Sequence, residues 1–137
     1  MEKEKLLTLV TNKAMTKGFE SMTNVLPSAP GPLTFVGPGS TEQLCVHISE
    51  LNVSKILVVT DKPLLELGVV AKATDVLKQK GVEVIVFDGV LPDPTLDLIE
   101  EGLAIQLKNS CDAILAIGGG SSIDTAKTIA AAATNGG

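Results

Sequence analysis

The stretch AILAIGGGSSID, residues 113–124, decides the fold of this chain. Its apolar run from Ala113 to Ile117 is typical of a strand that is buried on both faces of a parallel sheet. The three glycines at 118–120 predict a tight turn, and a helix is expected from Ser122 to about Thr134. A strand, a glycine turn and a helix in this order form one unit of an α/β domain.

The same alternation between two periodicities runs through the sequence before this stretch. The expected elements are strands at 33–36, 56–59 and 82–87, and helices from a cap at Ser40 or Thr41, from about Val69 to Lys80 and from about Thr95 to Lys108. Strands and helices in regular succession indicate a parallel sheet with helices on both faces. This is the Rossmann-like arrangement of dinucleotide-binding domains.

The first 30 residues have a different pattern. Apolar residues recur at three- to four-residue spacing from about Glu2 to Met22, which predicts one amphipathic helix. The prolines at positions 27, 30 and 32 then end any helix, because each lacks an amide donor. We therefore expect an amino-terminal helix and proline-rich linker at 1–30, followed by the α/β domain at 31–137.

Composition and charge restrict the class of partner. Hydrophobic residues make up 45% of the 137 residues, which is enough for a buried core. The formal net charge is -5, and no block of Lys or Arg forms a basic stripe. Aromatic residues are only 2%, which argues against a platform that stacks on bases. We expect neither a nucleic acid nor a membrane as partner.

The cysteines and the amino terminus indicate the compartment. Cys45 and Cys111 lie far apart in sequence and form no C-x-x-C pair, so two reduced thiols in a cytoplasmic protein are expected. The charged amino terminus lacks the apolar run of a signal peptide. No apolar stretch approaches the length that spans a membrane.

The glycines at 118–120 carry the strongest functional signal. Without Cβ atoms they let the backbone approach a ligand, and the helix that follows begins with unpaired amide groups and a partial positive charge that suit a phosphate. Ser121 and Ser122 add hydroxyl donors. A second interpretation needs no ligand, because Ser121 and Asp124 stand three residues apart, as in a capping box. Capping does not, however, require three consecutive glycines.

This turn differs from the usual dinucleotide fingerprint G-x-G-x-x-G. Position 123 is Ile123 instead of glycine, and the acidic residue expected about 20 residues later falls beyond the sequence. An earlier acid, Asp61, follows the strand at 56–59. Its carboxylate can accept from the adenosine ribose hydroxyls and repel the 2′-phosphate of NADP. It can equally be the N-cap of a helix that begins at Lys62 and Pro63.

Several motifs together resemble those of one known family. GGGS at 118–121 with Asp124, preceded by VTDK at 59–62 and LPDPT at 91–95, is similar to the iron-containing (group III) alcohol dehydrogenases. The stretch FVGPGS at 35–40 matches the opening strand and turn of that family. The resemblance covers roughly residues 33–135, with the motifs in the right order and spacing.

The resemblance implies an oxidoreductase of two domains that acts on a small alcohol or aldehyde. Its amino-terminal half, similar to that of dehydroquinate synthase, binds NAD(P), and a helical carboxyl-terminal domain holds divalent iron or zinc that polarises the alcohol oxygen. Carried over by motif, the contacts to the pyrophosphate and the neighbouring ribose would be Gly119, Gly120, Ser121 and Asp124. Asp61 would lie at the adenosine ribose and favour NAD. Asp93 would lie beside the cofactor, where many relatives carry Asn.

The resemblance also implies features that this sequence lacks. His47 is the only histidine, and a lone histidine on an amphipathic helix is far more often a packing or surface residue than a metal ligand. We therefore expect no metal ligand and no catalytic residue in this chain. The metal domain is expected to be absent, so that the chain alone would bind NAD at most weakly and would not oxidise alcohols. Position 122 is Ser122, where relatives often carry Pro.

Other functions stay open at this point. Glycerol dehydrogenase, glycerol-1-phosphate dehydrogenase and dehydroquinate synthase share this kind of domain, although LPDPT at 91–95 favours the alcohol dehydrogenases. Alternatively, the chain is a non-catalytic nucleotide-binding or assembly module whose first helix docks on a partner. Exposed apolar surface of that kind would also permit a homo-oligomer. A hydrolase that uses Ser121 or Ser122 is disfavoured, because no base accompanies either serine.

Overall fold

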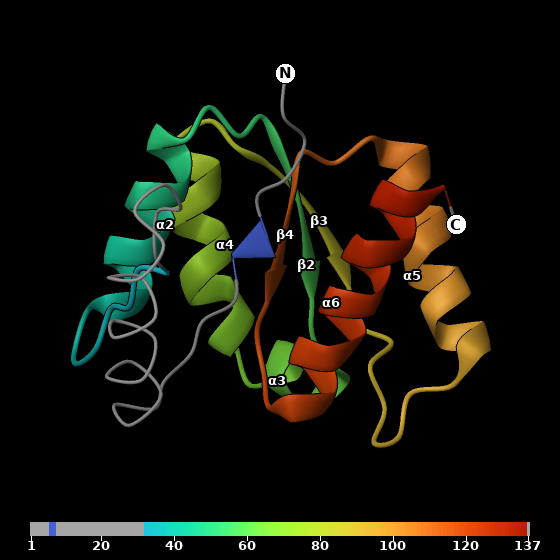
Figure 1. Ribbon diagram of the computed structural model, residues 1–137. Helices are drawn as coiled ribbons and strands as arrows, with labels where there is room; N and C mark the ends of the chain where they lie inside the picture. The colour runs from blue at the N-terminus through green and yellow to red at the C-terminus, as the bar shows by residue number, and fades with distance from the viewer. Residues whose placement is uncertain (1–5, 8–31, 137) are drawn as a thin grey trace, which may run out of the picture.

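A parallel sheet forms the centre of the molecule (Figure 1). The computed structural model describes residues 6–7 and 32–136, in which the sheet has four strands in the order β1-β4-β2-β3. The strands are β1 (Leu6–Leu7), β2 (Lys55–Val59), β3 (Glu83–Phe87) and β4 (Ala113–Ala116). All of their pairings are parallel, which confirms the predicted α/β class.

Helices cover both faces of this sheet (Figure 1). On one face lie α2 (Ser40–Glu50) and α4 (Val69–Gln79), and on the other lie α5 (Leu96–Asn109) and α6 (Gly120–Asn135). The short helix α3 (Lys62–Glu66) follows β2 at the end of the sheet where the strands finish. The predicted two-sided arrangement is therefore confirmed.

Two apolar cores lie between the sheet and the helices, because successive side chains of a strand point to opposite faces. In β2, Ile56 and Val58 join the core against α2 and α4. Leu57 and Val59 join the core against α5 and α6. All four side chains are fully buried, which explains why the sequence of β2 is continuously apolar instead of alternating.

The helix predicted at 2–22 is wrong at residues 6–7, which are the part of this stretch that the structure describes. Leu6 and Leu7 form β1 and pair with Ile114 and Leu115 of β4. Two adjacent leucines fit a strand as well as a helix, and the edge of β4 provides backbone partners that periodicity in the sequence does not reveal. The rest of that helix and the linker up to residue 30 lie outside the described residues.

The strand predicted at 33–36 is also wrong, because these residues have no regular structure. Leu33 and Val36 are exposed, whereas Phe35 packs against the core beside α2. The ring of Phe35 lies 5.9 Å from the ring of His47. The packing of Phe35, and not a ladder of backbone hydrogen bonds, therefore joins this segment to the domain.

Two helices begin at residues other than the predicted ones. Gly39, in the left-handed conformation with φ 81, is the N-cap of α2, and neither Ser40 nor Thr41 caps it. At α6, Gly119 is the N-cap and the helix begins at Gly120, two residues before the predicted start. In both cases a glycine is the N-cap, but only Gly39 has the positive φ that favours glycine, since the φ of -86 at Gly119 is open to any residue.

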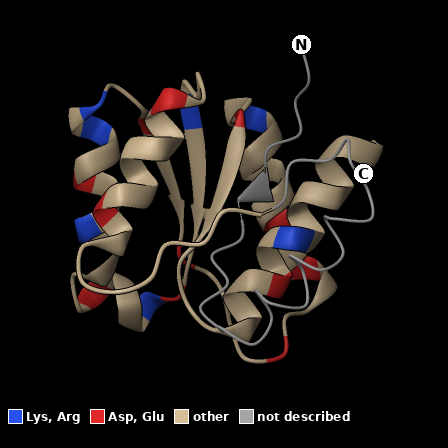
Figure 2. Ribbon diagram, turned by 60° about the vertical axis from the view of Figure 1, so that its left-hand side comes forward, with Lys and Arg blue, Asp and Glu red and all other residues tan. Residues whose placement is uncertain are grey.

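Most of the acidic and basic residues belong to the helices and loops (Figure 2). Acidic and basic residues are interspersed in this view, and the strands carry few of either. Among the described residues, the helices are all too short or too polar to cross a bilayer.

Candidate functional site

Three loops meet at the carboxyl edge of the sheet, since parallel strands all end on the same side. β2 leads into Asp61 and α3, β3 leads into the loop at 88–95, and β4 leads into the glycine turn before α6. Figure 1 shows α3, this loop and the start of α6 together at the lower end of the sheet. An isolated bridge between Asp61 and Gly89 joins the first two loops. Open parallel sheets bind ligands at this edge.

The first glycine of the turn is required by the fold. Gly118 has φ 147, a backbone conformation that side chains disfavour. A Cβ at this position would collide with the Ser122 side chain, whose Cβ would be 2.9 Å away. Gly118 therefore allows β4 to turn sharply into α6.

The next two glycines are not required by the fold. Gly119 has φ -86, which any residue can adopt, and Gly120 is not among the residues with positive φ. A Cβ added to either glycine would meet no heavy atom within 4 Å. Both residues are exposed. Their missing side chains therefore leave open space in front of the turn, as a closely approaching ligand needs.

The start of α6 presents unpaired amide groups to this open space. The first hydrogen bond of the helix runs from the Ile123 amide to the Gly119 carbonyl, at 3.1 Å. The amides at 120–122 precede it and have no acceptor one turn earlier in the helix. Because α6 is 16 residues long, its aligned peptide dipoles add partial positive charge at this end. The geometry suits an anion.

The prediction of a capping box formed by Ser121 and Asp124 is wrong. α6 begins at Gly120, so both residues lie inside the helix, and no side chain caps it. Ser121 is half-buried and Asp124 is exposed. The serine and the aspartate at this helix start are therefore not explained by capping.

Asp61 is the N-cap of α3, as one of its two interpretations predicts. Its backbone is extended, and its Oδ1 accepts a hydrogen bond from the Leu64 amide at 2.9 Å. Pro63 stands in the first turn of the same helix. The second carboxylate oxygen, Oδ2, takes no part in this bond. The cap therefore leaves Oδ2 available to a ligand.

Asp61 and the glycine turn are connected through one side chain. Leu64, whose amide is bonded to Asp61, places its Cδ1 3.4 Å from the position that a Cβ on Gly118 would take. The cap of α3 and the turn before α6 therefore lie next to each other. Residues 57 positions apart in sequence belong to one edge of the molecule.

Asp93 lies in the loop that follows β3. It lies exposed in the loop at 88–95 and has φ 55, in the left-handed region. Asp and Asn tolerate this conformation better than most residues. No hydrogen bond joins Asp93 to Asp61 or to the turn within the described ranges.

Sequence reasoning missed Thr60. Its side chain is fully buried, and its Oγ1 has no hydrogen-bond partner among the described residues. The Thr60 amide donates to the Phe87 carbonyl at 2.9 Å, and the Thr60 carbonyl accepts from the Val90 amide at 3.2 Å. These bonds attach the loop after β3 to the end of β2. Thr60 precedes Asp61 directly, but only the sheet pairing reveals its role.

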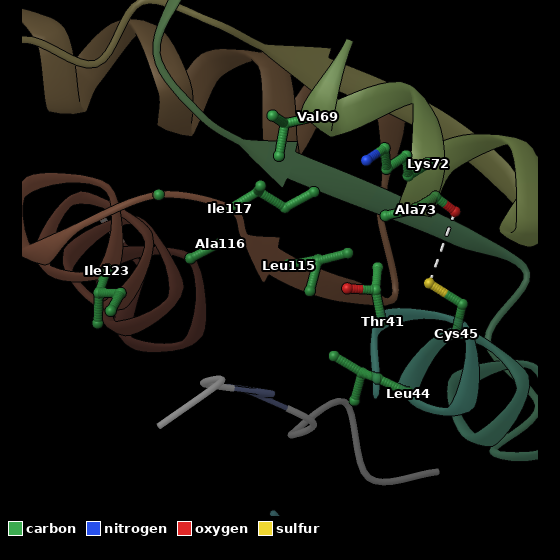
Figure 3. A pocket seen from close by; sticks show the side chains of 11 residues that line it. Thr41, Leu44, Cys45, Val69, Lys72, Ala73, Leu115, Ala116, Ile117 and Ile123 are labelled. Atoms are coloured by element: carbon green, nitrogen blue, oxygen red, sulfur yellow. Dashed lines mark hydrogen bonds between the residues drawn. The ribbon is translucent and has the colours of Figure 1, made fainter. Parts of the chain in front are cut away.

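A cavity of about 320 Å³ lies behind the turn, between α2, α4 and the end of β4 (Figure 3). Its walls are mostly apolar, with Thr41 and Lys72 as polar exceptions. Cys45 lines it and donates its thiol to the Ala73 carbonyl at 3.5 Å. Burial raises the pKa of Cys45 to about 11. The thiol is therefore protonated at neutral pH and unsuited to act as a nucleophile.

The described residues do not fit a metal site. Within 6–7 and 32–136, no group of three His, Cys, Asp or Glu side chains is placed to hold an ion. His47 contacts Phe35, and its Nδ1 lies 4.0 Å from Glu50.

The fold and the turn together define a Rossmann-like α/β domain. The family model for iron-containing alcohol dehydrogenases matches residues 32–137. The chain belongs to this family of oxidoreductases.

Named relatives support the assignment. The chain is 39% identical over 99 residues to the lactaldehyde reductase of Escherichia coli K12, across 72% of this chain and 26% of that protein. It is 34% identical over 106 residues to the NAD-dependent methanol dehydrogenase of Bacillus methanolicus, across 77% and 28%. The solved structure of a 1,3-propanediol oxidoreductase matches with a TM-score of 0.70 and 40% identity, across 73% and 26%. The chain thus spans about a quarter of the length of these relatives.

Proposed function

We propose that this chain binds NAD at the carboxyl edge of its sheet, as the cofactor-binding part of an iron-type alcohol dehydrogenase. The substrate class proposed for the whole enzyme is a small alcohol or its aldehyde. Family membership and the name of the methanol dehydrogenase relative support this reaction class. The observation that carries the proposal is the open space at Gly119 and Gly120, where the fold itself does not require glycine.

The diphosphate of NAD is assigned to the glycine turn. The amides at the start of α6 donate to its oxygens, and hydrogen bonds to a charged group contribute about 1.5–3 kcal/mol each. The Ser121 hydroxyl adds a donor, and Asp124 lies one turn further, beside the neighbouring ribose. The partial positive charge of a 16-residue helix favours this placement.

The adenosine ribose is assigned to Asp61. The bond from Leu64 to Oδ1 fixes the carboxylate, and Oδ2 accepts from the ribose hydroxyls. A 2′-phosphate in that place would bring two negative charges together, so Asp61 selects NAD over NADP. Asp93 is proposed to lie beside the cofactor, on the neighbouring loop.

NAD supplies the hydride acceptor when it is bound. The residues of this chain bind and orient it, and none of the described residues is assigned a role in hydride or proton transfer. Both cysteines are buried free thiols, which agrees with a cytoplasmic setting as part of the proposal.

Isothermal titration of the purified chain with NAD, and separately with NADP, tests this function. We expect saturable binding of NAD and at least about tenfold weaker binding of NADP, a difference of about 1.4 kcal/mol. A chain that is folded by circular dichroism but releases no binding heat with NAD would contradict the proposal.

A further inference from the structure

The outer edge of β3 has no partner strand among the described residues. β3 is the last strand in the order β1-β4-β2-β3, and only β2 pairs with it there (Figure 1). We propose that this edge pairs with the same edge of a second copy of the chain, so that two sheets join across a two-fold axis. The interface goes beyond the proposed function, because it involves neither NAD nor the glycine turn.

The sequence of β3 is typical of an interior strand. Its residues at 84–87 are continuously apolar, as are those at 56–59 in β2, which are buried on both faces of the sheet. In β3, however, Val84 and Ile85 are only half-buried, and Val86 is 38% exposed. Open edges are commonly protected by lysine or proline, and β3 contains neither. This composition indicates an edge that another strand covers.

The backbone groups of two valines face the open edge. The Glu83 amide donates to a carbonyl just before β2, and the Phe87 carbonyl accepts from an amide just after β2, both at 2.9 Å. These two residues therefore direct their polar backbone groups toward β2. Because the direction alternates along a strand, the amides and carbonyls of Val84 and Val86 point away from β2.

One antiparallel register satisfies all of these outward groups. When Ile85 lies opposite Ile85 of the partner copy, Val84 lies opposite Val86 of the partner copy, and the reverse holds across the axis. Each such pair exchanges both of its backbone hydrogen bonds. Val84 packs against the core beneath α4, and Val86, two positions further on, points to the same face of the sheet. The pairing therefore covers the exposed Val86 side chain with an apolar neighbour.

Charges at the two ends of β3 favour the same orientation. Lys80 precedes the strand and Asp88 follows it, and neither belongs to an ion pair within the described residues. Antiparallel pairing places Lys80 diagonally across from Asp88 of the partner copy, within reach of a long side chain. A parallel arrangement would instead bring like charges together. Glu83, the one charge within the strand, is already paired with Lys55 at 3.2 Å.

Sedimentation velocity of the purified chain tests the interface. We expect a concentration-dependent dimer for the unaltered chain. Val86→Lys places a charge on the pairing edge and is expected to raise the dissociation constant of the dimer by about tenfold or more. Val69→Lys is the matched control, because Val69 is 39% exposed but lines the cavity beside β4. Its dimer should be as stable as that of the unaltered chain.

Exchange of charges tests the antiparallel orientation. Lys80→Glu and Asp88→Lys each place like charges opposite one another, and each should weaken its own dimer by about threefold or more. Mixed in equal amounts, the two variants are expected to form a heterodimer, since each supplies the charge that the other has lost. Lys80 and Asp88 of one copy stand at opposite ends of β3, so recovery in the mixture cannot arise within a single copy.

Two results would overturn the proposal. The first is a folded chain that stays monomeric up to about 1 mM, a concentration at which even a weak dimer forms. The second is a dimer that Val86→Lys leaves as stable as before, because another surface would then join the copies. Should Val86→Lys not fold by circular dichroism, the mixture decides. A mixture that dimerises no more tightly than the single variants would refute the antiparallel pairing.

Discussion

At the scale of single residues, Asp61 combines a structural and a proposed binding role. Its Oδ1 caps α3 through the Leu64 amide, and Leu64 Cδ1 lies 3.4 Å from the position that a Cβ on Gly118 would take. The sequence placed Asp61 at the end of a strand but left both roles equal, because a local pattern does not show which oxygen is engaged. The structure confirms the cap, and Oδ2 takes no part in it.

Two substitutions separate these roles of Asp61. Asp61→Asn keeps an oxygen that can accept from the Leu64 amide but removes the charge, so stability should change little while NADP gains affinity relative to NAD. Asp61→Ala removes the cap as well and is expected to lower the free energy of unfolding by about 1 kcal/mol. Urea unfolding and calorimetry with both cofactors provide the two measurements. If Asp61→Asn still binds NADP as weakly relative to NAD as the unaltered chain does, the charge of Asp61 is not what selects NAD.

At the scale of elements, α5 and α6 approach each other closely at Gly102. A Cβ on Gly102 would collide with the Cδ1 of Ile129 on α6 and would lie 3.1 Å from the ring of Phe87 on β3. Ile129 is fully buried at the centre of this core. The glycine therefore sets the spacing of two helices, one of which carries the candidate site at its start.

Gly102→Ala tests this packing. Alanine is the better helix former by about 1 kcal/mol, but overpacking a core commonly costs about 1–3 kcal/mol, so a net loss of stability is expected. Glu101→Ala, at the exposed neighbouring position, is the control and should be close to neutral. Chemical denaturation of both variants gives the comparison. A Gly102→Ala variant as stable as the unaltered chain would mean that the two helices are free to move apart.

The sequence predicted the buried elements better than their ends. β2, β3 and β4 and helices α4, α5 and α6 all appear near their expected positions. Burial on both faces makes β2 and β4 continuously apolar, and the helices show apolar residues at three- to four-residue spacing. The starts of α2 and α6 were wrong, since glycines at 39 and 119 replaced the expected serine and threonine caps. β1 was missed because its pairing depends on β4, which lies more than 100 positions away.

At the scale of the whole molecule, the two cores bury both thiols. Burial raises the pKa of Cys45 from its ordinary 9.0 to about 11, and it raises the pKa of Cys111 as well. The folded state therefore holds these protons more tightly than the unfolded state. The resulting stabilisation is fully present below pH 9 and is lost as the pH rises through 11.

The free energy of unfolding should consequently be level near pH 8 and fall above pH 9. Cys45 alone contributes a slope of up to about 1.4 kcal/mol per pH unit. Urea unfolding between pH 8 and 11 measures it, and Cys45→Ala should show a shallower slope over the same range. Equal slopes for the two proteins would contradict the proposed linkage.

The candidate site was predictable in part. Glycines at 118–120 and the acid at 61 are visible in the sequence because their residue types are unusual at the ends of apolar strands. The sequence could not predict that the fold requires Gly118 but not Gly119 or Gly120. This difference depends on the φ angles and on neighbouring side chains such as Ser122. Thr60 was likewise missed, because its bonds to the loop after β3 arise only when the two strands pair.

The central claim is that the open space before Gly119 and Gly120 receives a dinucleotide. Titration of NADH, followed by its own fluorescence, compares the unaltered chain with Gly120→Ala. The added methyl group meets no heavy atom of the protein within 4 Å, so the melting temperature should be unchanged or higher, while the affinity for NADH should fall by about tenfold or more. Equal affinities for the two proteins, or no binding by either, would contradict the account.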